Sequence, residues 1–521
     1  MKRLFAILLL GLFIMTSVMS CQDELEEQYT NPDQTSEASI GKFFTKMLNN
    51  DRVRPSYWNV RTFLVMHPGL YTQLVSYTNS NRRYQQQLSY IDDFWRDYYT
   101  PTGSGIVAHL REMEKAYVAL PAEEQSRADV FMTAASVVYA DQTSQMVDLW
   151  GDIPFSEAGQ LNLSGESVAP KFDDAGEIYS TLLSQLEDAA DYFATAQLES
   201  TVTAAFAKQD ILLEGSLERW RRYANSLRLR LLMRISFQDE AKAETEIMEM
   251  LNNPDAYPLA DDAAYDVLLE PLTTYNDNMR NALMEVTSHI APEFLLDGIL
   301  KPANDPRIRV WFDKNSSAGV PNEDYFSMPS DLSSTEQETN ISQGKYAMLD
   351  SATFLFNRAF PGIVINSAEV NFLKAEAYQR WGNTGDAKTA YEKGVTDAVN
   401  FMFYLNSLGN GTEEEVTSEE LDNLLASPSV AYAGTGDELL AKIWTQKWLS
   451  FGFMQSIQSW AEVRRTKTPS LTFIPDTSTP DSELPPSRLL YPSSEQTYNA
   501  TNYSRVASDD VATGKIFWDM K

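Results

Sequence analysis

Apolar residues recur at helical spacing through most of this 521-residue chain, whereas alternating strand patterns are few. In the stretch 217–235 the apolar side chains repeat every three or four residues, so they share one face of a helix. This pattern predicts a mainly α-helical protein. Further helices are expected at 105–120, 128–149, 176–196, 366–381, 385–405 and 438–460.

Two of these stretches, 366–381 and 385–405, resemble a tetratricopeptide-like helical hairpin. Such hairpins alternate small and large side chains, so that two antiparallel helices can approach closely. The proline that commonly ends such a repeat is absent, because Val399 stands there. The alternating positions are Ala375, Tyr378, Gly382, Ala387, Tyr391 and Gly394.

The stretch 253–365 differs from its surroundings, because it is rich in Pro, Asn, Asp, Ser and Gly. A structureless loop of that length is unusual in a compact domain, so we expect parts of it to pack back onto the helices. We therefore expect residues 39–521 to form a single domain, with 253–365 as a loop-rich insertion into a helical frame.

The first twenty residues have the layout of an export signal, with a basic start before the apolar run 4–15. That run is shorter than the roughly 20 residues needed to span a bilayer as a helix. The residues 18–21 resemble a bacterial lipobox, in which the cysteine is acylated and the chain is cleaved before it. We predict a lipoprotein signal peptide at 1–20 and a lipid on Cys21, with an uncleaved anchor helix as the alternative.

The segment 21–38 begins with a cluster of acids and contains no basic residue, so it reads as a solvated tether. An acidic cluster directly after a lipidated cysteine also resembles the surface-export signal of Bacteroidota-type lipoproteins. We therefore expect an outer-membrane location, with the protein lipid-anchored and facing the cell exterior. The net charge of −31 argues against nucleic acid as a partner and against a basic membrane-binding face.

The chain contains no recognisable catalytic motif. Cys21 is its only cysteine, and none of its three histidines (His67, His109 and His289) lies at metal-ligand spacing on a helix. We predict that the protein is not an enzyme and uses no cofactor. A two-carboxylate glycoside hydrolase stays open, because such a pair is recognised only by its separation in space. A structural calcium ion at the oxygen-rich stretch 276–278 also stays open, although the spacing is not that of an EF-hand.

Several short strings follow one another in order between residues 148 and 519. Each is weak alone, but their order and spacing behind a lipobox argue against chance agreement. The strings are Asp148-Leu149-Trp150-Gly151-Asp152-Ile153-Pro154, Trp220-x-x-Tyr223-Ala224-Asn225-Ser226-Leu227-Arg228-x-Arg230, Asn304-Asp305-Pro306-Arg307, Glu369-x-x-Phe372-Leu373-x-Ala375-Glu376-Ala377, Gln446-Lys447-Trp448, Trp460-x-Glu462-x-Arg464-Arg465-Thr466, Tyr491-Pro492 with Glu495, and Trp518-Asp519.

Together these strings resemble the SusD/RagB family of nutrient-binding outer-membrane lipoproteins, in particular its second large branch. The resemblance implies a mainly α-helical fold, in which four tetratricopeptide-like hairpins support a loop-rich half that holds the ligand. It also implies capture of glycan or peptide oligomers and their delivery to a SusC-like TonB-dependent outer-membrane transporter. A cell-surface glycoside hydrolase and a helical-repeat scaffold or adhesin are the alternatives.

Most of these strings are expected to build the fold rather than to hold the ligand. Gly151 permits a left-handed helix cap, and Pro154 prevents the helix from continuing. The string 446–448 is expected to lie in the core. Arginine is retained inside proteins when it is paired, so we expect buried acid partners for Arg228, Arg230, Arg464 and Arg465.

Sugar rings and extended peptides are both held by aromatic faces together with a few amides and charges. Such residues are densest in the stretch 71–99. Trp95 has a competing interpretation as part of a helical core face, and Trp311 as a core residue. The candidate ligand-binding residues are Tyr71, Tyr77, Asn79, Arg83, Tyr84 and Trp95 in a first group, and Tyr275, Trp311 and Tyr325 in a second.

Overall fold

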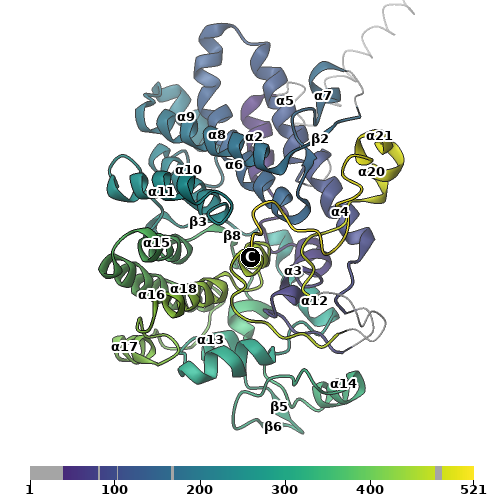
Figure 1. The fold of residues 1–521 in the computed structure, drawn as a ribbon, viewed down its shortest axis with the longest axis vertical. Coiled ribbons are helices and arrows are strands. Elements are labelled where there is room, and N and C mark those ends of the chain that lie inside the picture. Colours follow the sequence, from purple (N-terminus) through teal and green to yellow (C-terminus); the bar gives the residue numbers. More distant parts are fainter. Residues whose placement is uncertain (1–38, 80–82, 102–103, 166–168, 476–483) are drawn as a thin grey trace, which may run out of the picture.

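Helices make up most of the protein, and its few strands are short, so the prediction of a mainly α-helical fold is confirmed (Figure 1). The predicted signal peptide, Cys21 and the acidic tether lie outside the described residues. No helix in the described part is long and apolar enough to cross a membrane. The computed structural model describes residues 39–79, 83–101, 104–165, 169–475 and 484–521.

Long helices form the top and left of the molecule in Figure 1, and we call this part the helical half. Their apolar faces are buried against one another, as where α5 packs on α6, α8 on α10 and α15 on α16. The helices of this half are α2 (Ile40–Leu48), α5 (Ile106–Val118), α6 (Ala122–Trp150), α8 (Ala175–Thr195), α9 (Ser200–Gln209), α10 (Leu217–Arg234), α11 (Glu240–Asn252), α15 (Ser367–Trp381), α16 (Thr384–Leu408), α17 (Ser418–Ala426), α18 (Gly436–Phe451) and α19 (Ser456–Thr466).

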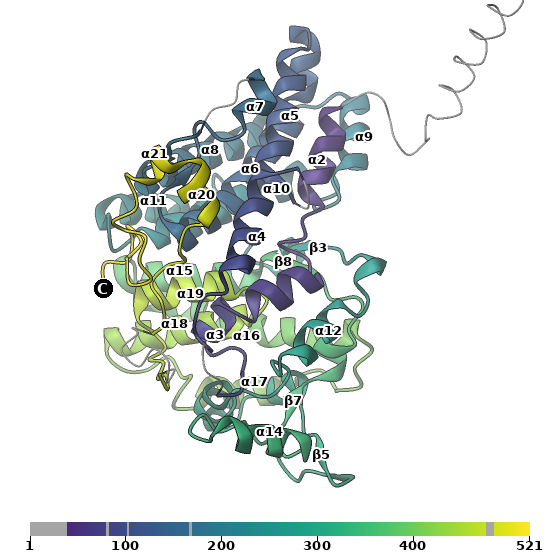
Figure 2. The same ribbon diagram turned by 90° about the vertical axis from the view of Figure 1, so that its right-hand side faces the viewer.

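Short elements joined by long connections form the loop-rich half, which comprises residues 49–79, 83–87 and 253–365. Figure 2 shows α14 and β5 of this half at the end of the molecule opposite to α5 and α6. Its elements are η1 (Asn59–Leu64), α3 (Pro68–Tyr71), η2 (Ala263–Tyr265), β3 (Val267–Leu269), η3 (Thr273–Tyr275), α12 (Asn278–Glu285), η4 (Phe294–Leu300), η5 (Lys301–Ala303), α13 (Ile308–Trp311), β4 (Phe312–Asp313), β5 (Ser316–Ser317), β6 (Val320–Pro321), α14 (Ser334–Ser342), β7 (Met348–Leu349), η6 (Ser351–Leu355) and β8 (Gly362–Ile365).

The remaining elements lie between or after the elements of these two halves. They are α4 (Leu88–Tyr99), β1 (Ile153–Pro154), α7 (Gln160–Ser164), β2 (Phe172–Asp173), α20 (Ser493–Tyr498) and α21 (Ala500–Tyr503). In the C-terminal segment the amide of Leu489 donates to the carbonyl of Leu149 at 2.8 Å, so this segment is fastened to the end of α6. Among the described residues the strands form four two-stranded antiparallel sheets, β1–β2, β3–β8, β4–β7 and β5–β6.

The helical hairpin predicted from the alternation of small and large residues is present as α15 and α16. These two helices pack against each other along their length. A Cβ atom on Gly394 would lie 2.9 Å from the ring of Phe372, closer than carbon atoms normally approach. Glycine at this position therefore allows the two helices to come together.

The helix predicted at 438–460 is wrong as a single element. The structure divides it into α18 and α19, and Gly452 in the break has a φ of 53°. A positive φ is strained for most residues but open to glycine, so glycine permits the turn. Apolar periodicity continues across the break because both helices face the same core, which is why the sequence pattern hides it.

Buried arginines tie the helices of the helical half to one another. Arg230 donates two hydrogen bonds to Glu369, at 2.6 and 2.7 Å, and Arg465 donates at 2.7 Å to both Glu376 and Glu462. Although burial opposes ionisation, Arg465 and its neighbour Lys447 lower the pKa of Glu376 to about 2. These pairs confirm the prediction that the arginine strings build the fold.

Arg464 departs from that prediction. Its guanidinium donates to the backbone carbonyls of Asp148 and Ser487, both at 2.8 Å, and no acid forms an ion pair with it among the described residues. Burial lowers the pKa of Arg464 to about 9. Carbonyl acceptors cannot be recognised in a sequence, because every residue carries one.

Candidate ligand-binding site

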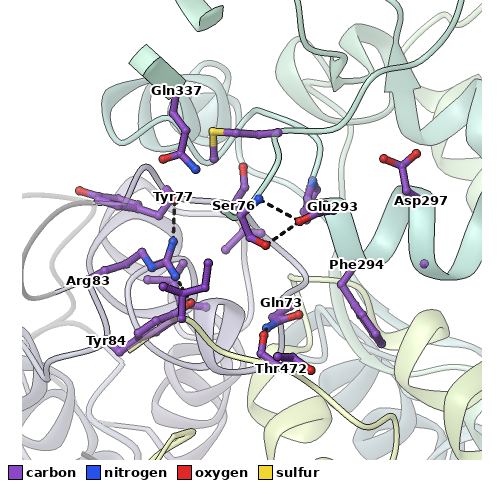
Figure 3. Close-up of a pocket in the computed structure, with 17 residues that line it drawn as sticks. Gln73, Ser76, Tyr77, Arg83, Tyr84, Glu293, Phe294, Asp297, Gln337 and Thr472 are labelled. Carbon is purple, nitrogen blue, oxygen red and sulfur yellow. Dashed lines mark hydrogen bonds between the residues drawn. The ribbon is translucent and has the colours of Figure 1, made fainter. Parts of the chain in front are cut away.

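A cavity of about 400 Å³ opens in the loop-rich half, where segments far apart in the sequence meet (Figure 3). Its walls come from the chain after α3, from η4 with the residues before it, and from the segment 328–330 with α14. Thr472 and Ile474, beyond α19, close one side. We call it the first cavity.

Aromatic rings form two sides of the first cavity. Figure 3 shows Tyr77, Arg83 and Tyr84 on one side and Phe294 on the other. The guanidinium of Arg83 lies 4.3 Å from the centre of the Tyr84 ring and donates to its hydroxyl. Tyr77 is half-buried, so part of its ring is free to contact a ligand.

Polar side chains between these rings are fixed by hydrogen bonds. The carboxylate of Glu293 accepts from the backbone amide of Ser330 at 2.8 Å and from its hydroxyl at 2.6 Å. The side-chain amide of Gln73 donates to the carbonyl of Thr472 at 2.6 Å. Gln337 is fully buried and supports the wall, because its side-chain amide donates to the carbonyl of Pro329 at 2.8 Å. Groups held in this way are oriented before a ligand arrives, which lowers the entropy that binding costs.

The predicted residues of the segment 77–84 lie together at the first cavity. Tyr77, Arg83 and Tyr84 line it. Asn79 supports its wall, because its amide nitrogen donates to the carbonyls of Ser330 and Leu332 and its backbone amide donates to Gln337. This segment is therefore joined to α14 and to the chain before it.

Three other predicted residues must be removed from the candidate set. Tyr71, Trp95 and Trp311 are 0%, 3% and 1% exposed and pack inside the hydrophobic core. Trp95 lies against Trp150 and Tyr491, with ring centres 5.2 and 5.8 Å away. A side chain without free surface offers no face to a ligand, so the core interpretation holds for Trp95 and Trp311, and the prediction for Tyr71 is wrong.

The second predicted group is dispersed. The hydroxyl of Tyr275 donates to Asp51, away from the first cavity. Tyr325 lines a second cavity of about 340 Å³, with walls formed by η5, α13 and α17. The structure therefore does not bring Tyr275, Trp311 and Tyr325 together.

Comparison with known proteins decides the family. The chain matches the SusD-like family model described as "Starch-binding associating with outer membrane" over residues 32–492. The chain belongs to this family. A comparison with curated proteins found no match.

Solved structures of SusD-like proteins share the fold. A chitin-binding protein superposes with a TM-score of 0.73 at 22% identity, covering 92% of this chain and 99% of its own. A chitin-binding SusD homologue from Flavobacterium johnsoniae gives 0.71 at 20% identity, covering 92% and 99%. A SusD homologue from Bacteroides fragilis gives 0.73 at 20% identity, covering 93% and 100%. At these identities the likeness establishes the fold alone.

Much of the SusD-like cavity was missed by the sequence analysis. Gln73 stands in a stretch that was singled out, but Glu293, Phe294, Asp297 and Gln337 belong to the long loop-rich insertion. Pairing of Pro292 with Met328 in an isolated bridge brings these residues together. No local pattern marks such a bridge, so only the fold could identify them.

A third cavity, of about 460 Å³, lies between the loop-rich half and α16. Its wall includes Phe401 and Tyr404, whose ring centres are 6.1 Å apart, and the carboxyl group of Asp266. Burial raises the pKa of Asp266 to about 7. Asp266 also accepts a hydrogen bond from the first amide of α15, that of Ser367, at 2.7 Å, which gives it a role in the fold.

The described residues contain no group of three or more His, Cys, Asp or Glu side chains placed to hold a metal ion. The three histidines are all buried and separate from one another. Burial lowers the pKa of both His67 and His109 to about 4. Asp277, in the stretch considered for calcium, forms an exposed ion pair with Arg358 at 3.4 Å.

Proposed function

We propose that this SusD-like chain is a surface lipoprotein whose first cavity binds neutral glycan oligomers and passes them to a transporter. The observation that carries the proposal is the composition of the cavity wall. The partly exposed rings of Tyr77 and Phe294 stand there beside amides and carboxylates that are already held in place. Rings stack on the apolar faces of sugars, while the polar groups bond sugar hydroxyls.

The charges at the cavity favour a neutral ligand. Asp297 accepts from Ser327 and pairs with Lys301 at 3.0 Å, and Arg83 is engaged with Asn79 and Tyr84. A charged ligand would have to compete with these internal partners. The family description, which names starch, and the two chitin-binding relatives support a glycan rather than a peptide.

We propose binding without turnover. Glu293 and Asp297 are both at the cavity, and a glycosidase needs two carboxyl groups, one of which donates a proton. Here the Glu293 carboxylate accepts two hydrogen bonds from Ser330, and Asp297 pairs with Lys301, so both carboxyl groups already have partners in the cavity wall. Family members are binding proteins, which agrees with this assignment.

The cellular setting rests on the family and on the N-terminal sequence. The family description associates its members with the outer membrane. A lipid on Cys21, exposure to the cell exterior and a SusC-like TonB-dependent barrel as partner complete the proposal. Affinity purification of the full-length protein from outer membranes tests the partner: a large TonB-dependent barrel is expected, and its consistent absence would contradict this part.

Calorimetry on residues 22–521 tests the ligand. We expect binding of maltoheptaose or chitohexaose but not of a mixture of hexapeptides, and no shorter products after prolonged incubation. Tyr77→Ala should weaken binding about 10-fold, because an aromatic contact contributes roughly 0.5–1.5 kcal/mol beyond its buried area. Tyr498→Ala, at an 85% exposed ring outside the cavities, is the control. Binding of the peptides alone, or release of shorter sugars, would overturn the proposal.

A further inference from the structure

The first and second cavities are built on the same two stretches of chain. Phe294, Asp297 and Gly298 of η4 face the first cavity, and Lys301, at the start of η5, faces the second. In the second stretch, residues 324–330, Met328 and Ser330 line the first cavity, and Asp324 and Tyr325 line the second. The cavities are thus neighbours along both walls.

Ion pairs join the walls of the two cavities. Asp297, at the first cavity, pairs at 3.0 Å with Lys301, at the second, and Lys301 also pairs with Asp324 at 3.4 Å. The ammonium of Lys301 lies 5.8 Å from the centre of the Phe326 ring. Phe326 is 46% exposed, so its ring offers an apolar face between the two cavities.

The second cavity has the chemistry of a neutral polar ligand. Its main charges are paired within the wall, Lys301 with Asp324 and Arg309 with Glu420 at 2.7 Å. Tyr325 supplies a half-buried ring, and the amide of Asn423 is exposed on α17. A ligand with hydroxyl groups could bond these paired charges without having to supply a counter-ion.

We propose that the two cavities are subsites of one binding surface, which takes a neutral oligosaccharide long enough to cross the ridge of Lys301 and Phe326. This inference rests on the proposed function of the first cavity. The four residue steps from Asp324 to Met328 span at most roughly 13 Å, which leaves room for more than one sugar ring. Selection of long over short glycans follows, because only a long chain reaches Tyr325.

Calorimetry with paired short and long sugars tests this arrangement in residues 22–521. The probes are maltose with maltoheptaose, and chitobiose with chitohexaose. We expect the long sugar to bind at least about 10-fold more tightly than the disaccharide, since a second ring contact adds roughly 1 kcal/mol or more. Tyr325→Ala should remove most of that difference and leave disaccharide affinity within about twofold.

Two further variants separate the outcomes. Asn423→Ala, at an exposed position, should give a smaller loss for the long sugar only, and it serves if Tyr325→Ala fails to fold. Tyr77→Ala should weaken short and long sugars alike. If the ratio of long-sugar to disaccharide affinity is unchanged in both second-cavity variants, the inference is wrong but the proposed function stands. The same conclusion follows if Tyr325→Ala abolishes binding of the disaccharide. Absence of any sugar binding by the unaltered protein would overturn both.

Discussion

The helical half and the loop-rich half both contain many charged and polar side chains, but they use them differently. In the helical half, Arg230 and Arg465 are buried with their acid partners and have no surface left for a ligand. Around the first cavity, Glu293 and Gln73 are also hydrogen-bonded, but each retains a side that faces open space. Most of the recognisable strings of the sequence therefore mark the frame, and much of the first cavity is lined by residues with no local signature.

Loss of a frame charge should have the largest effect. Arg465→Ala leaves the buried acids Glu376 and Glu462 without their main partner, and breaking such a pair typically costs about 3–5 kcal/mol. Arg127→Ala is the matched control, because Arg127 also has two acid partners but is 47% exposed, and we expect a change below about 1 kcal/mol. Urea unfolding measures both. An equal fall in the free energy of unfolding in both variants would show that the buried Arg465 contributes no more to stability than the exposed Arg127.

Asp266, in the loop-rich half beside the start of α15, should make stability depend on pH. Burial raises the pKa of this acid to about 7, so the folded protein holds its proton more tightly than the unfolded chain does. The contribution of Asp266 to the free energy of unfolding is therefore fully present below about pH 4, and it is lost as the pH rises to 7.

Asp266→Asn should remove the loss of stability that Asp266 causes as the pH rises. Relative to the unaltered protein it should gain roughly 2–4 kcal/mol between pH 4 and pH 7.5, measured by urea unfolding at each pH. Asp255→Asn, at an exposed acid, should follow the unaltered protein. A gain that is independent of pH would contradict the explanation by burial.

Close packing in the frame predicts an effect of intermediate size. Gly394→Ala would push a Cβ atom to 2.9 Å from the Phe372 ring, and such overpacking costs about 1–3 kcal/mol. Gly436→Ala, in the first turn of α18, meets its nearest neighbour at 3.7 Å and should be neutral or stabilising. Thermal unfolding compares the two. A loss of stability in both variants would mean that the close approach to Phe372 does not explain the need for glycine at position 394.

The smallest change in stability is expected at the first cavity. Glu293→Gln should leave the free energy of unfolding within about 1 kcal/mol, because one side of this residue already faces solvent. Oligosaccharide affinity should nevertheless fall about 10-fold, since hydrogen bonds to a charged acceptor contribute roughly 1.5–3 kcal/mol. Urea unfolding and calorimetry on the same sample separate the two effects. A large loss of stability would place Glu293 with the frame.

The sequence was sufficient to predict the helical class, the α15–α16 hairpin and the buried pairing of Arg230 and Arg465, because each leaves a periodic or local signal. Arg228 is buried and paired as well, but its partners Glu187 and Glu246 are 48% and 25% exposed. It also identified Tyr77, Arg83 and Tyr84, since polar and aromatic residues crowd there. Trp95 and Trp311 were misplaced because a large ring has the same sequence signature in a core as at a surface. Glu293 and Gln337 were missed because their meeting depends on contacts between distant segments.

The central claim is that ligand binds in the loop-rich half and that the helical half only supports it. A crystal structure of residues 22–521 with maltoheptaose or chitohexaose tests this most directly. We predict a sugar ring against Tyr77, with its hydroxyls within hydrogen-bonding distance of Glu293. Sugar bound along the helical half, or in the third cavity beside Asp266 and Tyr404 with the first cavity empty, would contradict the account.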